Sequence, residues 1–192
     1  MSFDTQNINK TRVDLSKFDE IWLFAYGSLI YKVDFPILAS EVATVKDWQR
    51  RFWQGSHDHR GTEDNPGRVL TLIHEPGAIC QGIAYRVSKD VFEYLDYREK
   101  NGYLRSEVAI QFADGSQKTG LIYIADEHND AYLGPATEMQ IAEHIHRCEG
   151  PSGSNADYVL NLAQTLRANG LHDDHVFHIE QLLATQVGAV SP

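Results

Sequence analysis

The chain has 192 residues, which is the length of one ordinary domain or of two small ones. Its formal net charge of −10 at pH 7 argues against non-specific binding to nucleic acid or to an anionic membrane surface. No apolar run approaches the roughly 20 residues of a membrane-spanning helix, so we expect neither nucleic acid nor membrane as a partner.

The N-terminal residues are polar and lack the apolar segment of a secretory signal. We expect residues 1–20 to be a polar leader that is ordered late or frayed and residues 21–192 to form a single domain. Cys80 and Cys148 belong to no CxxC motif and lie beside no motif that indicates a nucleophile. They are therefore predicted to be buried, reduced thiols in a cytoplasmic protein.

Residues 21–29, IWLFAYGSL, form a short apolar run that ends in a turn signal, a pattern typical of a buried strand followed by a tight turn. Gly27 has no Cβ, so it can adopt a positive φ and let another group come close. Successive N–H groups of such a turn can hold an anion, for example the carboxylate of an amino acid. The alternative is an ordinary core strand with a glycine turn.

The next segments also favour strands. Residues 41–54 show a period of two that places Arg50 and Phe52 on one face, opposite Arg51 and Trp53. A long polar loop follows at residues 55–68, and loops of this length in a compact domain often carry function. Two hairpins are expected, one of residues 69–74 and 80–87 turning at 75–77, the other of residues 104–112 and 118–125.

Helices are predicted mostly in the second half of the chain, over residues 89–100, 137–147, 155–169 and 174–185. Thr137 with Gln140, and Ser154 with Asp157, have the spacing of capping boxes. Gly170 is placed to end the third of these helices. Paired strands followed by helices indicate an α+β fold whose largely antiparallel sheet could curl into a barrel.

Glu99 is the strongest candidate for a catalytic residue. It lies seven residues after Phe92 and four after Leu95, so it projects from the apolar stripe of the predicted helix. Burial and the negative end of the helix dipole both raise the pKa of a carboxyl group there, which suits a general base. The alternative is a structural ion pair with Arg98, Arg105 or an arginine of residues 49–52. We interpret Asp96 as solvent-facing.

Other polar residues give weaker signals. Arg60 and Arg68 flank the polar loop and could bind a substrate carboxylate or brace the loop. Tyr132 could donate to a substrate or simply pack on the sheet. The loop pair His57 and His59, and the series His172, His175 and His178, are more typical of solvated surface histidines than of metal ligands.

Several separated stretches resemble the ChaC-type γ-glutamylcyclotransferases, most closely the glutathione-specific branch. They occur in the order and spacing of that family and cover about residues 21–185. The stretches are YGSL at 26–29, RRFWQGSHDHRGT at 50–62, PGRVLTL at 66–72, YLDYREKNGY at 94–103, YLGP at 132–135 and GPSG at 150–153.

The resemblance implies a small mixed β-barrel with flanking helices, a γ-glutamyl-binding loop, and Glu99 as the acid/base. The binding residues that it implies are Leu23, Phe24, Ala25, Tyr26, Gly27 and Ser28. Relatives usually carry glycine where this chain has Ala25, so the fine geometry of the loop is open. Ser28 is interpreted as a binding residue and not as a nucleophile, because YGSL is not a G-x-S-x-G elbow.

The reaction implied is the cleavage of glutathione to 5-oxoproline and cysteinylglycine, which requires no metal and no organic cofactor. One alternative is a cyclotransferase that acts on other γ-glutamyl amino acids or amines. A second is a non-catalytic γ-glutamyl-binding module, which would gain nothing from a carboxylate on an inward stripe. The sequence leaves the oligomeric state open.

Overall fold

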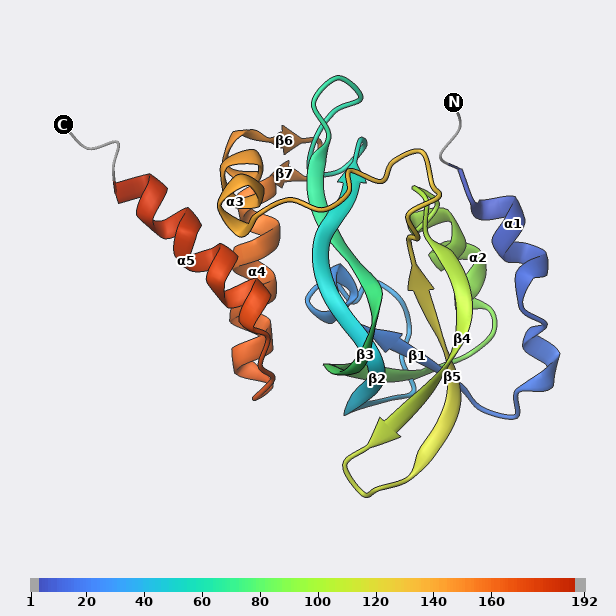
Figure 1. The fold of residues 1–192 in the computed structure, drawn as a ribbon. Helices are drawn as coiled ribbons and strands as arrows, with labels where there is room; N and C mark the ends of the chain where they lie inside the picture. The colour runs from blue at the N-terminus through green and yellow to red at the C-terminus, as the bar shows by residue number, and fades with distance from the viewer. Residues whose placement is uncertain (1–3, 189–192) are drawn as a thin grey trace.

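The computed structural model describes residues 4–188, and side chains up to residue 185. Five strands close into a barrel in the order β1-β3-β2-β4-β5, and a separate two-stranded sheet pairs β6 with β7 (Figure 1). The strands are β1 Ile21–Ala25, β2 Ala39–Ser56, β3 Gly67–Val87, β4 Leu104–Phe112, β5 Gln117–Ile124, β6 Glu149–Gly150 and β7 Gly153–Ser154. The helices are α1 Gln6–Arg12, η1 Leu15–Lys17, η2 Ser28–Ile30, α2 Val91–Arg98, α3 Glu138–Arg147, α4 Asn155–Ala168 and α5 Asp174–Gly188.

Strand β1 lies inside the fold, and all five of its residues are buried. It pairs antiparallel with β3 and parallel with β5, through Leu23 and Leu121. A strand covered on both faces needs a continuous apolar sequence, which explains why IWLFA lacks alternation. The other pairings are antiparallel, so the predicted small, mixed, largely antiparallel barrel is confirmed.

The predicted hairpin at residues 75–77 is wrong. Strand β3 runs through this segment and pairs along its length with β2, so the hairpin joins β2 and β3 through the polar loop at residues 57–66. The turn-like sequence forms a bulge, where Asp47 has a φ of 64° and its side chain accepts a hydrogen bond from the Gly77 N–H. A bulge tolerates Pro76 because some residues in it do not need a ladder donor.

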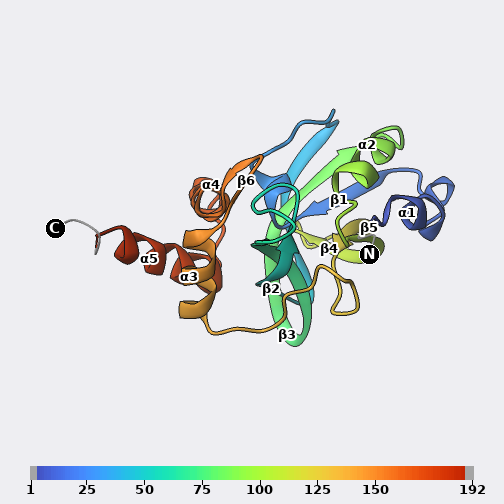
Figure 2. The ribbon, with the colours of Figure 1, turned by 90° about the horizontal axis from the view of Figure 1, so that it is seen from above.

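The predicted hairpin of β4 and β5 is confirmed, with Gly115 at a φ of 84° in its turn. Figures 1 and 2 show α3, α4 and α5 on one side of the barrel and α1 and α2 on the other. The alternation predicted for β2 also holds, because Arg50 and Phe52 are buried whereas Arg51 and Trp53 are partly exposed.

Local capping fixes the helix ends near the predicted positions. Thr137 and Gln140 form a complete capping box at α3. At α4, the Ser154 hydroxyl accepts from the Asp157 N–H. Gly170 follows α4 with a φ of 67°, and the Leu171 N–H donates to the Leu166 carbonyl, which is a Schellman arrangement. Helix α2 is shorter than the predicted helix over residues 89–100, and its N-cap is Asp90.

Over its described part, the predicted polar leader contains α1 and η1. Asn9 of α1 is fully buried, donates to the Tyr103 carbonyl and accepts from the Arg105 N–H. Thr5 also bonds the carbonyls of Lys100 and Tyr103. These polar contacts satisfy backbone groups of the α2–β4 connection, and they carry no periodic apolar pattern that the sequence could reveal. Over residues 4–188, no helix has the length and apolar character needed to cross a membrane.

Candidate active site

A cavity of about 460 Å³ opens between α2, the polar loop at residues 57–66 and the start of α4. Its wall includes Ser28, Tyr31, Arg60, Arg98, Glu99 and Tyr158. A smaller recess of about 30 Å³ is lined by Gly27, Ser28, Leu70, Glu99, Tyr103 and Tyr158, together with Phe24, Tyr26, Leu29 and Tyr123. Because Ser28, Glu99, Tyr103 and Tyr158 belong to both linings, Glu99 lies where the cavity meets the recess.

Glu99 is the C-cap of α2, and its side chain is only 13% exposed. Burial raises the pKa of the carboxyl group above its ordinary value of 4.5, whereas the neighbouring Arg98 lowers it and Asp34 and Asp58 raise it further. The result is a carboxyl group that lines a cavity, with a pKa shifted upward. Such a group is suited to accepting and returning a proton.

The ion pair that we considered for Glu99 forms with Arg98, at 3.3 Å between Nε and Oε1. Arg98 is shared, because it also contacts the Asp34 carboxylate and donates to the Lys32 carbonyl. Although the charge of Arg98 lowers the pKa of Glu99, burial raises it more, so the pKa stays above its ordinary value. The pair therefore orients the carboxylate beside the cavity without neutralising the effect of burial.

The prediction that Asp96 faces solvent is wrong, because Asp96 is only 2% exposed. Arg105 donates to both of its carboxylate oxygens at 3.0 Å, and the Tyr123 hydroxyl donates at 2.6 Å. A buried carboxylate needs such partners to offset desolvation. These contacts fix α2 against β4 and β5, and with it the helix end that carries Glu99.

In the turn after β1, Gly27 has a φ of −121° and a ψ of −133°, so the positive φ that we considered does not occur. Its lack of a Cβ still matters, because a Cβ there would lie 3.0 Å from the Tyr158 hydroxyl oxygen. Among the described residues, neither the Gly27 N–H nor the Ser28 N–H donates a hydrogen bond to a backbone carbonyl in a turn, loop or cap. The first N–H groups of any helix, η2 included, lack acceptors within it.

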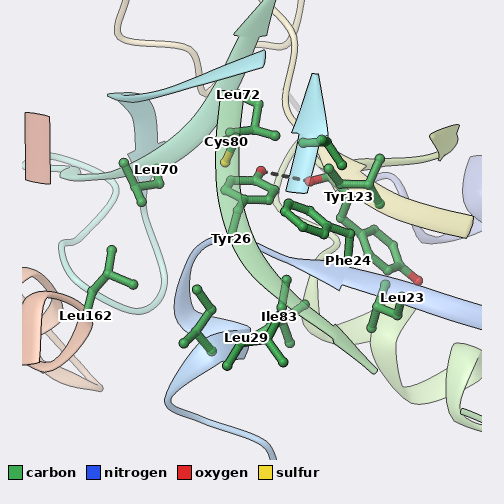
Figure 3. Close-up of a cluster of buried hydrophobic side chains, with 14 of the residues drawn as sticks. Leu23, Phe24, Tyr26, Leu29, Leu70, Leu72, Cys80, Ile83, Tyr123 and Leu162 are labelled. Carbon is green, nitrogen blue, oxygen red and sulfur yellow. Dashed lines mark hydrogen bonds between the residues drawn. The ribbon is translucent and has the colours of Figure 1, made fainter. Parts of the chain in front are cut away.

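The six predicted binding residues divide into two sets. Phe24, Tyr26, Gly27 and Ser28 line the recess, and Ser28 also lines the larger cavity. Leu23 and Ala25 are fully buried and line neither of these two cavities. Figure 3 shows Leu23 and Phe24 packed in the core and the Tyr26 hydroxyl donating to the Tyr123 carbonyl, at 2.7 Å.

Tyr103 and Tyr158 line both the cavity and the recess, although we predicted no role for either residue from the sequence. The Tyr103 hydroxyl donates to the Leu70 carbonyl at 2.6 Å, and the Tyr158 hydroxyl accepts from the Leu70 N–H at 3.3 Å. Both therefore bond the same residue of β3. An inward tyrosine on a strand or helix has the sequence pattern of any core aromatic residue, so no signal distinguished them.

The remaining candidates lie apart from the cavity, except for two. Arg60 and His59 line it. Arg68 instead donates to the carbonyls of Phe52 in β2 and Gly134 before α3, and so connects these two segments. Tyr132 forms an isolated bridge with Gln54 and is absent from the cavity wall.

His175 is a correction to the predicted solvated histidines. It is buried one turn before Ile179 on the inward face of α5, accepts from the Phe52 N–H and contacts Glu138 at 2.8 Å. His172 and His178 are exposed. Among residues 4–188, no three His, Cys, Asp or Glu side chains gather as a metal site would require.

Comparison with known proteins gives a consistent result. The model of the family described as "ChaC-like protein" matches residues 21–186. The zebrafish (Danio rerio) protein "Glutathione-specific gamma-glutamylcyclotransferase 1" is 41% identical over 177 residues, covering 86% of this chain and 90% of that protein. "Gamma-glutamylcyclotransferase 2-3" of Arabidopsis thaliana is 40% identical over 169 residues, covering 81% of this chain and 84% of that protein.

A solved structure is also similar. The crystal structure of a yeast γ-glutamyl cyclotransferase described as specific to glutathione superposes with a TM-score of 0.79 at 29% identity. The match covers 86% of this chain and 96% of the yeast chain. The resemblance therefore extends over the barrel and its helices.

Proposed function

Because this chain belongs to the ChaC-like protein family, we propose that it is a lyase that cleaves glutathione to 5-oxoproline and cysteinylglycine. The names of its relatives in fish and yeast support this activity. The observation that carries the proposal is the position of Glu99, a largely buried carboxylate with a raised pKa where the cavity meets the recess.

The reaction needs little from the enzyme, because glutathione contains both reacting groups. The α-amine of its glutamyl residue attacks its own γ-amide carbon and closes a five-membered ring. The C–N bond to cysteine breaks as the ring forms. Holding the ends in the reactive conformation can contribute several kcal/mol toward lowering the barrier, since effective molarities of oriented groups are large.

Proton transfer is the part that requires a side chain. The α-amine is protonated near neutral pH and attacks only after it loses a proton, which Glu99 accepts. The departing amide nitrogen is a poor leaving group unless it gains a proton, which Glu99 then returns. The ring nitrogen loses a second proton as it becomes an amide nitrogen, and the released amine of cysteinylglycine gains a second proton as it becomes an ammonium group. Two protons therefore move from one nitrogen to the other, and one carboxyl group can serve as base and then as acid in this exchange.

We propose that residues 23–28 bind the γ-glutamyl group. The Gly27 and Ser28 N–H groups would receive the α-carboxylate or the oxyanion that develops on the γ-carbonyl oxygen. In this proposal Phe24, Tyr26, Gly27 and Ser28 shape the recess. Leu23 and Ala25 act only by fixing the strand that precedes the turn, since both lie in the core.

A cyclotransferase for other γ-glutamyl compounds would use the same proton transfers and differ only in the leaving group. The test is release of 5-oxoproline from glutathione and from γ-glutamyl-alanine, with both products identified. We expect glutathione to be turned over with the higher kcat/KM. Equal or greater turnover of γ-glutamyl-alanine would reject glutathione specificity and leave the reaction class intact.

We also propose that the protein acts in the cytoplasm, on a small-molecule substrate and without a nucleic acid partner. Its two cysteines are free and buried, as is usual for thiols of a reducing compartment. The negative charge of the chain disfavours polyanion binding. Fractionation of cells with an antibody to the protein tests the location directly.

A further inference from the structure

The cavity wall carries more positive than negative charge, although the chain as a whole is strongly negative. Its cationic side chains are Lys32, Arg60, Arg98 and Lys100, and its carboxylates are Asp58 and Glu99. A cleft of one sign attracts ligands of the other. The balance therefore favours an anionic substrate over a neutral one.

Three of the four cations are engaged or exposed. Arg98 contacts the carboxylates of Asp34 and Glu99. Lys100 lies over the Tyr97 ring, 4.3 Å from its centroid, and Lys32 is exposed to solvent. Arg60 is partly buried in the wall and its guanidinium donates to a neutral acceptor, the Ser154 carbonyl, at 2.9 Å, whereas the guanidinium of Arg98 is also paired with two carboxylates.

The loop that carries Arg60 is held in place by neighbouring backbone. The Arg60 N–H donates to the Ser56 hydroxyl, and the Ser152 N–H donates to the His59 carbonyl. Gly150 packs so closely that a Cβ on it would lie 2.5 Å from the Gly61 nitrogen. A cation positioned this way loses little entropy when it binds a carboxylate.

Arg60 and Glu99 line the same cavity, so a single ligand can contact both. Arg60 lies beside the Tyr31 phenol. Burial raises the pKa of this phenol, and the positive charge of Arg60 lowers it. The Tyr31 and Tyr158 rings are in edge contact, with centroids 6.1 Å apart, and Tyr158 lines the recess with Glu99. A dipeptide leaving group, whose two extended residues span at most about 7 Å, would lie along this wall when the glutamyl end is at Glu99.

We infer that Arg60 is a specificity-determining residue that binds the terminal carboxylate of the leaving group, the glycyl carboxylate of glutathione. This inference rests on the proposed function. Arginine donates two parallel hydrogen bonds to a carboxylate. Glutamyl amines and the amide of glutathione present no such carboxylate, so Arg60 favours glutathione over them.

The test compares glutathione with its glycine amide, which has nearly the same shape but lacks the negative charge. Release of 5-oxoproline is measured for the wild type, Arg60→Gln and Arg60→Lys. Arg147→Gln is the matched control, because Arg147 is exposed and outside the cavity.

A charge-assisted contact predicts that the wild type prefers glutathione over the amide by about 10- to 100-fold in kcat/KM. Arg60→Gln should lose most of this preference, mainly by slower turnover of glutathione at low concentration, and Arg60→Lys should recover part of it. Arg147→Gln should keep the preference.

Two results overturn the inference. Equal kcat/KM of the wild type for glutathione and the amide, or an unchanged preference in a folded Arg60→Gln, rejects the role of Arg60 and leaves the proposed function standing. No 5-oxoproline from either substrate with the wild type rejects both proposals.

Discussion

Arg50 donates through Nε to the Tyr26 carbonyl, at 2.7 Å, from a position that is 1% exposed. In a trans peptide the carbonyl and the next N–H point in opposite directions. The contact therefore directs the Gly27 N–H away from Arg50 and leaves it available to the recess that Gly27 lines. Arg50 in turn contacts Asp173, just before α5, at 3.0 Å.

This relationship makes Arg50 a positioning residue for the turn. Lysine at this position keeps the charge opposite Asp173 but cannot reproduce the guanidinium fork. We expect Arg50→Lys to lower the free energy of unfolding by about 1.5–3 kcal/mol. We also expect it to lower kcat/KM for glutathione by about tenfold or more in the protein that remains folded. Urea unfolding and steady-state assays at low temperature measure the two effects.

The control is Arg86→Lys, which alters a partly exposed arginine of the same barrel that pairs with Glu20. Exposed pairs of this kind contribute little to stability, so both measurements should stay near the wild-type values. If Arg50→Lys lost stability but kept its full kcat/KM, Arg50 would only support the core.

Gly27→Ala tests the close approach of the Tyr158 hydroxyl. The added methyl group would lie 3.0 Å from the hydroxyl oxygen, so the turn or Tyr158 must shift. Because a misplacement of about 1 Å can reduce a rate by roughly 100-fold, we expect kcat/KM to fall substantially while the fold is retained. Gly115→Ala is the control. It replaces a glycine in the turn between β4 and β5, where an added Cβ would have no neighbour within 4 Å. A fully active Gly27→Ala would argue against substrate binding by this turn.

Glu99 should reduce stability at neutral pH. Burial raises the pKa of its carboxyl group in the folded state above the ordinary value of 4.5. The folded protein therefore binds this proton more tightly than the unfolded chain does. The stabilisation that this proton gives the folded state is complete at pH values below the ordinary pKa, and it is lost as the pH rises through the raised pKa of the folded state. Glu99→Gln should show a higher Tm than the wild type at pH 7, with the difference shrinking toward pH 4.

Thermal unfolding of both proteins from pH 4 to pH 7 measures this difference. Glu93→Gln, an exposed change on the same helix, is the control. A lower Tm for Glu99→Gln at pH 7 would mean that the ion pair with Arg98 outweighs burial and that Glu99 is a structural residue.

Local sequence signals predicted the features that depend on few neighbours. The strand at residues 21–25, the β4–β5 hairpin with Gly115 and the capping box of Thr137 and Gln140 all formed as expected. The inward position of Glu99 followed from its spacing to Phe92 and Leu95. These features are set within one element or one turn, where side-chain period and capping chemistry are decisive.

The errors concern choices between partners distant in sequence. Pro76 and Gly77 are turn formers, yet pairing of β2 with β3 over a long register made their segment a bulge. Asp96 of α2 was predicted to face solvent because its partners come from distant strands, Arg105 from β4 and Tyr123 from β5. Whether His175 is buried likewise depended on how α5 packs against Phe52 and Glu138.

The proposed activity depends most directly on proton transfer by Glu99. The decisive measurement is the release of 5-oxoproline and cysteinylglycine from glutathione, with wild type and Glu99→Gln compared side by side. Glutamine keeps the shape but cannot accept the proton, so turnover should fall by about 10²- to 10⁴-fold, the usual contribution of general acid–base catalysis. Near wild-type turnover by a folded Glu99→Gln would contradict the mechanism.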